Sequence, residues 1–320
     1  MNQLQNETIF ITGGAGFIGS KLIEKLLPNN KIIVFDNFFR NSLRYKDYMN
    51  DPNITIVKGD ILHLEDIQQS LHQATYIVHA AGIAGIDTVT QNPINTMKVN
   101  MLGTLHVLEA ASKLSQCKKV ICFSTSEVYG QRAFRSSEHS EAVLGAVGEA
   151  RWTYAVSKLA SEHLAYSYYK QLGLPTVILR PFNIYGPGQV GEGAIKLMVE
   201  KALKNQPIYI HGNGTQIRAW CYVDDMVDAI YCALVNDSAN GESFNIGNEK
   251  AITTINELAQ TIIRVLQSKS SIQHIDNSTA DIQLRIPDIK KAKELLHFEA
   301  KIDLEEGIRR TSKFIERENT

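Results

Sequence analysis

ETIFITGGAGFIG, at residues 7–19, is the stretch that decides the fold. Its β-branched first half predicts a short strand, and its glycines predict a tight turn that leads into a helix ending near Pro28. Such a turn leaves room for a pyrophosphate, which then meets the N-terminus of the helix. The pattern is typical of a dinucleotide-binding unit. The turn residues expected to contact the dinucleotide are Gly13, Gly16, Phe17, Ile18 and Gly19.

The next predicted strand ends at a residue that selects the cofactor. Lys31–Phe35 is a β-branched and aromatic run, and Asp36 follows it directly. A carboxylate at this point accepts hydrogen bonds from the adenosine ribose hydroxyls and repels a 2′-phosphate. The sequence therefore favours NAD over NADP. Arg40 and Arg44 are nearby positive charges, so NADP remains a minor alternative. The other interpretation of Asp36 is a carboxylate that only starts the following turn.

Strand and helix patterns alternate from here to residue 180. Predicted strands at 54–57, 75–78, 119–123 and 176–180 are separated by helical patterns and, after residue 130, by a polar loop rich in Ser and Glu. This alternation predicts an α/β fold with a doubly wound parallel Rossmann sheet. Ligands bind at the carboxyl ends of such strands. The further cofactor contacts expected there are Asp60, Ile61, Ala80, Ala81 and Pro181.

The sequence changes character after Pro181. Residues 185–193 hold four glycines and a proline, which predicts a mobile or ligand-covering loop. Helical patterns then continue to the C-terminus, and a short strand near 243–247 is expected to return to the sheet. We therefore predict a Rossmann domain at 1–180 and a smaller C-terminal substrate domain at 181–320.

One predicted helix carries a candidate acid–base pair. Tyr154 and Lys158 stand four residues apart, so a helix places both on one face, one turn apart. An ammonium beside a phenol favours the phenolate and lowers a pKa that is normally about 10. Tyr154 is then a candidate general base for a substrate hydroxyl. The same spacing is common on solvated helices, so the pair alone leaves both interpretations open.

The composition excludes several other classes. Charged residues make up 21% and apolar residues 44%, which is ordinary for a soluble protein, and the formal net charge is −1. Nothing therefore indicates a nucleic-acid or membrane partner, and no apolar run approaches the roughly 20 residues of a membrane helix. Residues 1–7 lack the pattern of an export leader, and the four cysteines lack metal-ligand or redox spacing. We expect a cytoplasmic protein with no metal site.

A set of motifs spread over nearly the whole chain points to one family. The motifs are TGGAGFIG at 12–19, Ser124-Thr125, Tyr154 with Lys158, RPFNIYGP at 180–187, GNGTQIR at 212–218 and YVDD at 222–225. Together they resemble the extended short-chain dehydrogenases/reductases, in the group of nucleotide-sugar epimerases, dehydratases and decarboxylases. The combination is specific to that group, though not to one reaction within it.

The resemblance implies a role for each matching residue. Tyr154 would take the proton of the sugar C4 hydroxyl while hydride passes from C4 to the nicotinamide of NAD. Lys158 would tune Tyr154 and hold the nicotinamide ribose, and Thr125 would hydrogen-bond the same hydroxyl. The positions that match binders of the sugar nucleotide and its diphosphate are Asn183, Arg218 and Arg285. A planar guanidinium suits a diphosphate because it makes paired, charge-assisted hydrogen bonds.

Two long predicted helices also match features of this group. Asn100, on the helix at 95–114, matches a position that orders the active-site helix, although a place on the helix surface is the alternative from its pattern alone. The helices at 95–114 and 154–172 resemble those that pair across a homodimer as a four-helix bundle.

Ser126 and Glu127 bear on the fate of the 4-keto sugar once C4 has been oxidised. Simple 4-epimerases usually have small residues where Glu127 stands, and 4,6-dehydratases usually have Asp where Ser126 stands. TSEVYG at 125–130 is instead similar to UDP-glucuronate decarboxylases, and Arg151-Trp152 resembles their bacterial branch that forms a 4-keto-pentose. The loop at 186–193 departs from that branch in sequence and length.

The resemblance therefore favours decarboxylation of a UDP-hexuronate, with Ser126 and Glu127 added to the candidate catalytic residues. Epimerisation at C4 is the leading alternative, followed by 4,6-dehydration or simple 4-oxidation. An NAD-binding regulator on the same fold is the non-enzyme alternative, and it is disfavoured because such proteins typically lose Tyr154 or Lys158, both of which are present.

Overall fold

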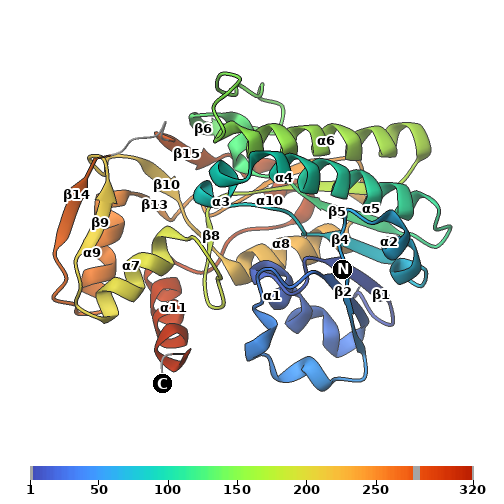
Figure 1. The fold of residues 1–320 in the computed structure, drawn as a ribbon, viewed down its shortest axis with the longest axis horizontal. Helices are drawn as coiled ribbons and strands as arrows, with labels where there is room; N and C mark the ends of the chain where they lie inside the picture. The colour runs from blue at the N-terminus through green and yellow to red at the C-terminus, as the bar shows by residue number, and fades with distance from the viewer. Residues whose placement is uncertain (1–2, 277–281, 319–320) are drawn as a thin grey trace.

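A seven-stranded parallel sheet forms the centre of the molecule (Figure 1). The structure is a computed structural model that describes residues 3–276 and 282–318; Met1 and Asn2, part of the polar start of the chain, lie outside these ranges. The strands run in the order β12-β7-β5-β4-β1-β2-β3. Their bounds are β1 (Thr8–Thr12), β2 (Lys31–Asp36), β3 (Ile54–Lys58), β4 (Tyr76–His79), β5 (Lys119–Phe123), β7 (Thr176–Pro181) and β12 (Ser243–Ile246).

This strand order confirms the predicted doubly wound fold. The chain runs outward from β1 through β2 to β3, then returns to place β4 on the other side of β1. The strand expected near 243–247 pairs in parallel with β7. The direction of winding changes between β1 and β4, and a crevice at their carboxyl ends is where such sheets bind ligands.

A smaller four-stranded sheet, in the order β13-β10-β15-β6, lies beyond those carboxyl ends. Its strands are β6 (Arg132–Ser136), β10 (Ile217–Ala219), β13 (Ile252–Thr254) and β15 (Leu284–Pro287). The presence of β6 corrects the polar loop expected after residue 130. Its exposed polar side chains gave no strand pattern, and it forms a strand by pairing with β15, about 150 residues later in the chain.

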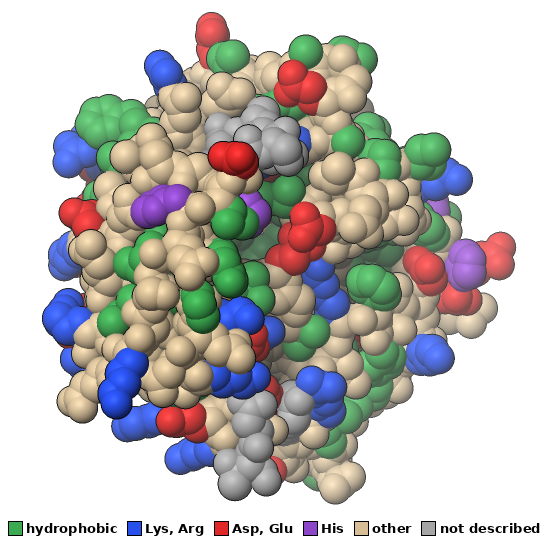
Figure 2. All heavy atoms as spheres, turned by 60° about the vertical axis from the view of Figure 1, so that its left-hand side comes forward, with side chains coloured by type: hydrophobic (Ala, Val, Ile, Leu, Met, Phe, Trp, Pro, Cys, Tyr) green, Lys and Arg blue, Asp and Glu red, His purple; other side chains and the backbone are tan. Residues whose placement is uncertain are grey.

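Helices and two short sheets complete this smaller part. The helices are α7 (Ala194–Leu203), α9 (Ile255–Val265) and α11 (Leu304–Glu318), and the paired strands are β8 (Ile184–Tyr185) with β11 (Cys221–Tyr222) and β9 (Ile208–His211) with β14 (Ile272–Ile275). Basic and acidic side chains are interspersed on the face shown in Figure 2. Within the described ranges no helix is long and apolar enough to cross a membrane.

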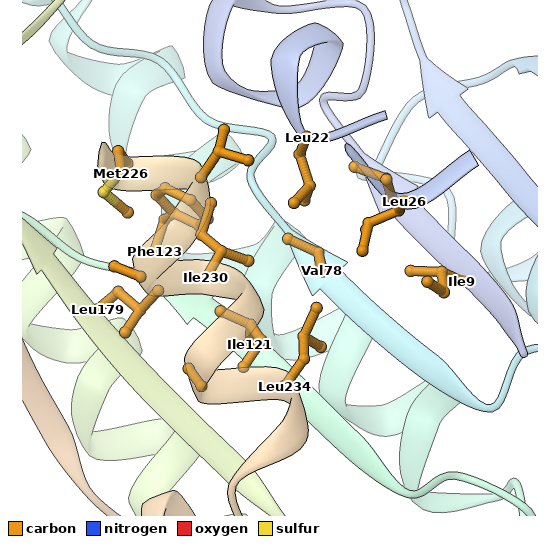
Figure 3. Packing of buried hydrophobic residues seen from close by; sticks show 14 of the residues in the cluster. Ile9, Leu22, Leu26, Val78, Ile121, Phe123, Leu179, Met226, Ile230 and Leu234 are labelled. Carbon is orange, nitrogen blue, oxygen red and sulfur yellow. The ribbon is translucent and has the colours of Figure 1, made fainter. Parts of the chain in front are cut away.

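Helices cover both faces of the large sheet. Alternation along β1 sends Ile9 and Ile11 to one face and Phe10 to the other. On the first face, Leu22 and Ile230 come from two helices that meet side by side over the sheet (Figure 3). The helices that cover the two faces are α1 (Phe17–Leu26), α8 (Val223–Val235) and α10 (Lys290–Leu296) on one and α2 (Leu64–Leu71), α5 (Gly103–Ser112) and α6 (Trp152–Leu172) on the other.

The helix expected at 95–114 is interrupted in its middle. It consists of α4 (Pro93–Met97), a π-helical turn η4 (Lys98–Leu102) and α5. Asn100 lies in the π-helical turn and is fully buried, so its alternative placement on the helix surface is wrong. Single π-helical turns are frequent at functional sites. Here the turn faces the crevice beside α6.

Candidate active site

A cavity of about 540 Å³ opens at the carboxyl ends of the central strands. It lies at the change of winding direction, where the fold predicts a ligand. All of the predicted cofactor residues except Lys158 and Pro181 line it. Those that do are Gly13, Gly16, Phe17, Ile18, Gly19, Asp36, Asp60, Ile61, Ala80 and Ala81.

Two glycines of the first turn are required by close contacts. Gly13 has φ of 69°, and a Cβ atom there would lie 2.6 Å from the backbone nitrogen of Ala81. A Cβ atom on Gly19 would lie 2.5 Å from the carbonyl oxygen of Gly13. The turn can therefore pack against the end of β4, and α1 against the turn, only without side chains. The N-cap residue of α1, Gly16, makes no side-chain hydrogen bond to the first backbone N–H groups of the helix. Those N–H groups can therefore bind a phosphate.

Asp36 is held at the end of β2 by the backbone of this turn. One carboxylate oxygen accepts a hydrogen bond from the Ala15 nitrogen at 2.9 Å, and the other from the Phe38 nitrogen at 2.7 Å. Burial raises the pKa of this carboxyl, and the backbone hydrogen bonds oppose that shift. Each oxygen has a further lone pair, so the group fits a ribose with two free hydroxyls.

Lys158 does not line the cavity itself but lies directly behind two residues that do, Phe123 and Gly82. Its Nζ donates to the Phe123 carbonyl oxygen at 2.9 Å and lies 3.2 Å from the point where a Cβ atom on Gly82 would stand. Burial lowers the pKa of Lys158 to about 8, while the negative charge of Glu162 opposes the shift.

The environment of Tyr154 differs from the one that its spacing predicts. Burial raises the pKa of the phenol above its usual value of 10, and the negative charge of Glu127 raises it further. The Thr125 hydroxyl hydrogen-bonds the phenol and opposes the shift. The ammonium of Lys158 is instead bonded to the end of β5. The expected lowering of the Tyr154 pKa by Lys158 is therefore wrong, because burial and Glu127 dominate.

The candidate residues after β5 lie on a short 3₁₀ helix, η5 (Ser126–Tyr129). Thr125 begins it, and its hydroxyl accepts a hydrogen bond from the Glu127 nitrogen at 3.2 Å. Arg285 reaches the same segment from β15: it donates to the Ser126 hydroxyl at 3.4 Å and to the Gly130 carbonyl oxygen at 2.6 Å. Glu127 is close enough for its charge to act on both Tyr154 and Arg285.

The three predicted substrate residues lie on or beside the smaller sheet. Arg218 and Arg285 are direct neighbours on paired strands β10 and β15. Asn183, which follows β7, donates its side-chain amide to the Ala219 carbonyl oxygen at 2.9 Å. Arg285 is only 2% exposed, and its Nε is buried without a partner. Its pKa is lowered to about 10 by burial and by the charges of Arg218 and Arg151, against the opposing charge of Glu127.

A buried hydrogen-bond network that the sequence did not predict holds η5 against the large sheet. Glu162 on α6 accepts two hydrogen bonds from Arg180 on β7, at 2.9 and 2.6 Å, and a short one from Ser124. Arg180 also donates to the Tyr129 hydroxyl, which in turn donates to Asn245 on β12. Arg180 and Tyr129 stand within recognised motifs, but their pairing depends on strand order. The network links α6, β7, β12 and η5.

Asn100 joins the cavity wall to the helix that carries Tyr154. Its side chain accepts from the Ile83 nitrogen at 2.9 Å and donates to the Ile83 carbonyl oxygen at 3.1 Å. It also donates to the Ser157 hydroxyl at 3.0 Å. The amide thereby fixes α6 relative to the loop after β4.

The glycine-rich loop at 186–193 forms part of the cavity lining through Gln189, Val190 and Glu192. The Glu192 carboxylate accepts hydrogen bonds from the backbone nitrogens of Asp87 and Thr88 at the start of α3 (Ile86–Gln91), and from the Thr88 hydroxyl. No sequence pattern indicated this attachment, because it joins residues 104 positions apart.

Comparison with known proteins agrees with this architecture. The model of the "NAD dependent epimerase/dehydratase family" matches residues 9–247. A UDP-N-acetyl-alpha-D-glucosaminuronate decarboxylase from Bacillus cytotoxicus is 36% identical over 94% of this chain and 95% of its own. UDP-glucuronic acid decarboxylase 5 from Arabidopsis thaliana is 34% identical over 95% of this chain and 87% of its own. The crystal structure of a UDP-glucuronic acid 4-epimerase from Bacillus cereus, in complex with UDP-glucuronic acid and NAD, superimposes with a TM-score of 0.89 at 28% identity, covering 97% of this chain and 99% of that one.

Proposed function

This chain belongs to the NAD-dependent epimerase/dehydratase family, and we propose that it is an NAD-dependent decarboxylase of a UDP-hexuronate. In this proposal, oxidation of the sugar C4 hydroxyl forms a 4-keto intermediate. The C5 carboxylate is then the carboxylate of a β-keto acid, which loses carbon dioxide. The similarity to the decarboxylases from Bacillus cytotoxicus and Arabidopsis thaliana supports this choice within the family.

The cavity fits the cofactor that this reaction needs. The glycine turn and the open N-terminus of α1 suit a pyrophosphate, and Asp36 suits an adenosine ribose without a 2′-phosphate. Lys158, directly behind Phe123 and Gly82, is placed to hold a second ribose. Bound NAD supplies the acceptor for the C4 hydride and a positive charge that lowers the pKa of a neighbouring phenol.

The chain's own residues divide the proton chemistry between two positions. Tyr154 takes the C4 hydroxyl proton, and the Thr125 hydroxyl, which already bonds the phenol, positions the same oxygen. The Glu127 backbone nitrogen donates to the Thr125 hydroxyl, and in this proposal the Glu127 carboxylate meets the substituents of C5. There it orients the departing carboxyl group and a water molecule, and the enolate left by carbon dioxide takes its C5 proton from that water.

One observation carries the choice of decarboxylation. The buried Arg285 hydrogen-bonds the Ser126 hydroxyl, and the charge of Glu127 acts on its guanidinium. Simple return of hydride to C4 needs neither an acid nor a cation beside C5. A guanidinium and a carboxylate in one segment are useful when the reacting group is itself a carboxylate.

Product analysis with the parent protein tests the reaction. Pure protein with NAD is incubated with a panel of nucleotide sugars, and products are identified by mass spectrometry and NMR. We expect loss of carbon dioxide from a UDP-hexuronate. No change in mass identifies 4-epimerisation, the alternative favoured by the likeness to the Bacillus cereus 4-epimerase structure. Loss of water identifies a dehydratase.

Glu127→Gln tests the assignment within the site. The variant should still form NADH in a single turnover but accumulate a 4-keto hexuronate, seen as persistent NADH absorbance and in the mass of the quenched sugar. Glu141→Gln, on the exposed polar segment after β6, is the matched control and should behave as the parent. Complete turnover by Glu127→Gln without NADH accumulation would exclude this role and favour 4-epimerisation.

We also propose that the protein is a homodimer through a four-helix bundle. The helical segment α4–η4–α5 packs beside α6 (Figure 1), and both expose large apolar side chains. These are Ile94, Leu102, Val156 and Tyr166. Val156→Glu should convert a dimer to a monomer in analytical ultracentrifugation, and a parent protein that sediments as a monomer would contradict the proposal.

A further inference from the structure

Arg151 stands at the start of α6, one turn before Tyr154. Residues three apart on a helix lie on the same side, so the guanidinium and the phenol face the same region. The Arg151 Nε is buried and has no hydrogen-bond partner. Within residues 3–276 and 282–318, Arg151 forms no ion pair with an acidic residue. A buried guanidinium nitrogen without a partner is an exception among folded proteins and calls for an acceptor.

A second unpartnered guanidinium nitrogen lies close by. The Nε of Arg285 is also buried without a partner, and that side chain is 2% exposed. The charge of Arg151 is among those that act on Arg285. The remaining nitrogens of Arg285 are bonded to η5, beside Glu127. Arg151 and Arg285 therefore approach the same segment from two elements, α6 and β15, and each keeps an open donor.

Sugar geometry separates these two arginines from the diphosphate. With the C4 hydroxyl at Tyr154, the atoms next to the reacting carbon are C3 and C5, whereas the diphosphate leaves from C1 across the ring. A cation one helical turn from Tyr154 can therefore meet a substituent of C3 or C5, and in a hexuronate the charged substituent is the C5 carboxylate. Arg218, on the paired strand β10, is then the arginine expected to bind the diphosphate.

We propose that Arg151 is a specificity residue that binds the C5 carboxylate of a hexuronate and so selects uronates over neutral hexoses. This inference rests on the proposed function, because it places the sugar C4 at Tyr154. A guanidinium recognises a carboxylate through paired, charge-assisted hydrogen bonds. The hydroxymethyl group of a neutral hexose carries no charge and gains much less from the same donor.

The test compares two ligands that differ only at this group. UDP-glucuronate and UDP-glucose are titrated calorimetrically, with NAD present, into protein that carries Tyr154→Phe to prevent turnover. Adding Arg151→Gln should weaken UDP-glucuronate binding at least tenfold and change UDP-glucose binding less than twofold. Arg151→Lys should recover part of the uronate preference, because it keeps the charge. Arg317→Gln, which removes an exposed arginine from α11, is the matched control and should alter neither affinity.

Each other outcome has a definite meaning. Equal weakening of both ligands overturns the proposal and assigns Arg151 to the diphosphate or to the fold, which NAD binding and circular dichroism of the same variant separate. An unchanged uronate preference also overturns it. If the parent releases no carbon dioxide but its uronate preference depends on Arg151, decarboxylation fails and the role of Arg151 stands. If the parent decarboxylates while Arg151→Gln keeps the preference, only the role of Arg151 fails.

Discussion

The two sides of the active-site crevice are built by different means. On the cofactor side, the wall consists of closely packed backbone, with glycines where a Cβ atom would collide and with one carboxylate held by two backbone N–H groups. On the sugar side, charged side chains come together from η5, β10, β15 and the start of α6, and they lie outside the lining of the cavity itself. Two guanidinium nitrogens there lack partners.

This difference teaches where each kind of selectivity resides. A backbone wall recognises shape, and its hydrogen bonds are satisfied within the fold. The charged side chains of the sugar side leave donors open in a buried place, so their full set of hydrogen bonds awaits an anionic ligand. Changes on the cofactor side should therefore alter which dinucleotide binds and how long it stays. Changes on the sugar side should alter chemistry.

The largest effect is expected at the phenol between the two sides. Tyr154→Phe should leave the fold and NAD affinity intact but slow C4 oxidation by about 10²-fold or more, the usual order for a general acid–base group. Single-turnover formation of NADH from a UDP-hexuronate measures this step. Tyr168→Phe, farther along α6 and bonded to Glu109, should match the parent. Near-parent NADH formation by Tyr154→Phe would show that another group is the base.

Lys158 is a buried ammonium that contacts two residues of the cofactor side, Phe123 and Gly82. Its pKa of about 8 lies below the ordinary 10.5, so from pH 8 to 10 the unfolded chain binds more protons at this site. The burial penalty of the charged form is therefore relieved as the pH rises. The stability of the parent relative to Lys158→Met should increase by about 2 kcal/mol over that range.

Urea unfolding of both proteins at pH 8, 9 and 10 measures this difference directly. Titrating groups that do not interact with Lys158 affect parent and variant alike and cancel in the comparison. The charge of Lys158 acts on the thiol of Cys122, but burial raises the pKa of that thiol to about 12, so it stays protonated in both folded proteins up to pH 10. If the two stabilities change in parallel with pH, the ammonium of Lys158 is less buried than the structure shows.

A smaller effect is expected at Asp36, the carboxylate that ends β2 on the adenosine side. The parent should prefer NAD over NADP by about tenfold or more, which is ~1.4 kcal/mol. Asp36→Asn should reduce that preference, because it removes the repulsion of a 2′-phosphate but keeps an acceptor oxygen. Titration of both dinucleotides measures the ratio, with Asp47→Asn as an exposed control. Equal affinities in the parent would contradict this interpretation of the cofactor side.

The smallest effect is expected at the glycine-rich loop at 186–193, which lines the cavity. Glu192→Ala removes the acceptor for two backbone N–H groups and the Thr88 hydroxyl, so the loop should open more often. NAD dissociation should speed up by about fivefold, in line with the loss of ~1 kcal/mol of hydrogen bonding. Stopped-flow displacement of NAD measures the rate, with Glu141→Ala as control. An unchanged rate would show that the loop does not retain the cofactor.

Local sequence patterns were sufficient to predict the residues of the cofactor side. The strand, glycine turn and helix at 7–19, and the carboxylate at the end of β2, lie within 30 residues of one another, and their geometry follows from strand and helix periods. The alternation of strands and helices up to residue 180 predicts a doubly wound parallel sheet, since parallel crossovers are right-handed. The sequence alone therefore determined the doubly wound sheet and the first-turn glycines and Asp36 that line its crevice.

Only the tertiary structure decided the sugar side. Arg285 meets Ser126 from 159 residues away, and β6 is a strand because β15 lies beside it. The spacing of Tyr154 and Lys158 predicted a lowered pKa, yet burial and Glu127 raise it. Such features depend on which charges come together in a low-dielectric place, and sequence spacing does not encode that arrangement.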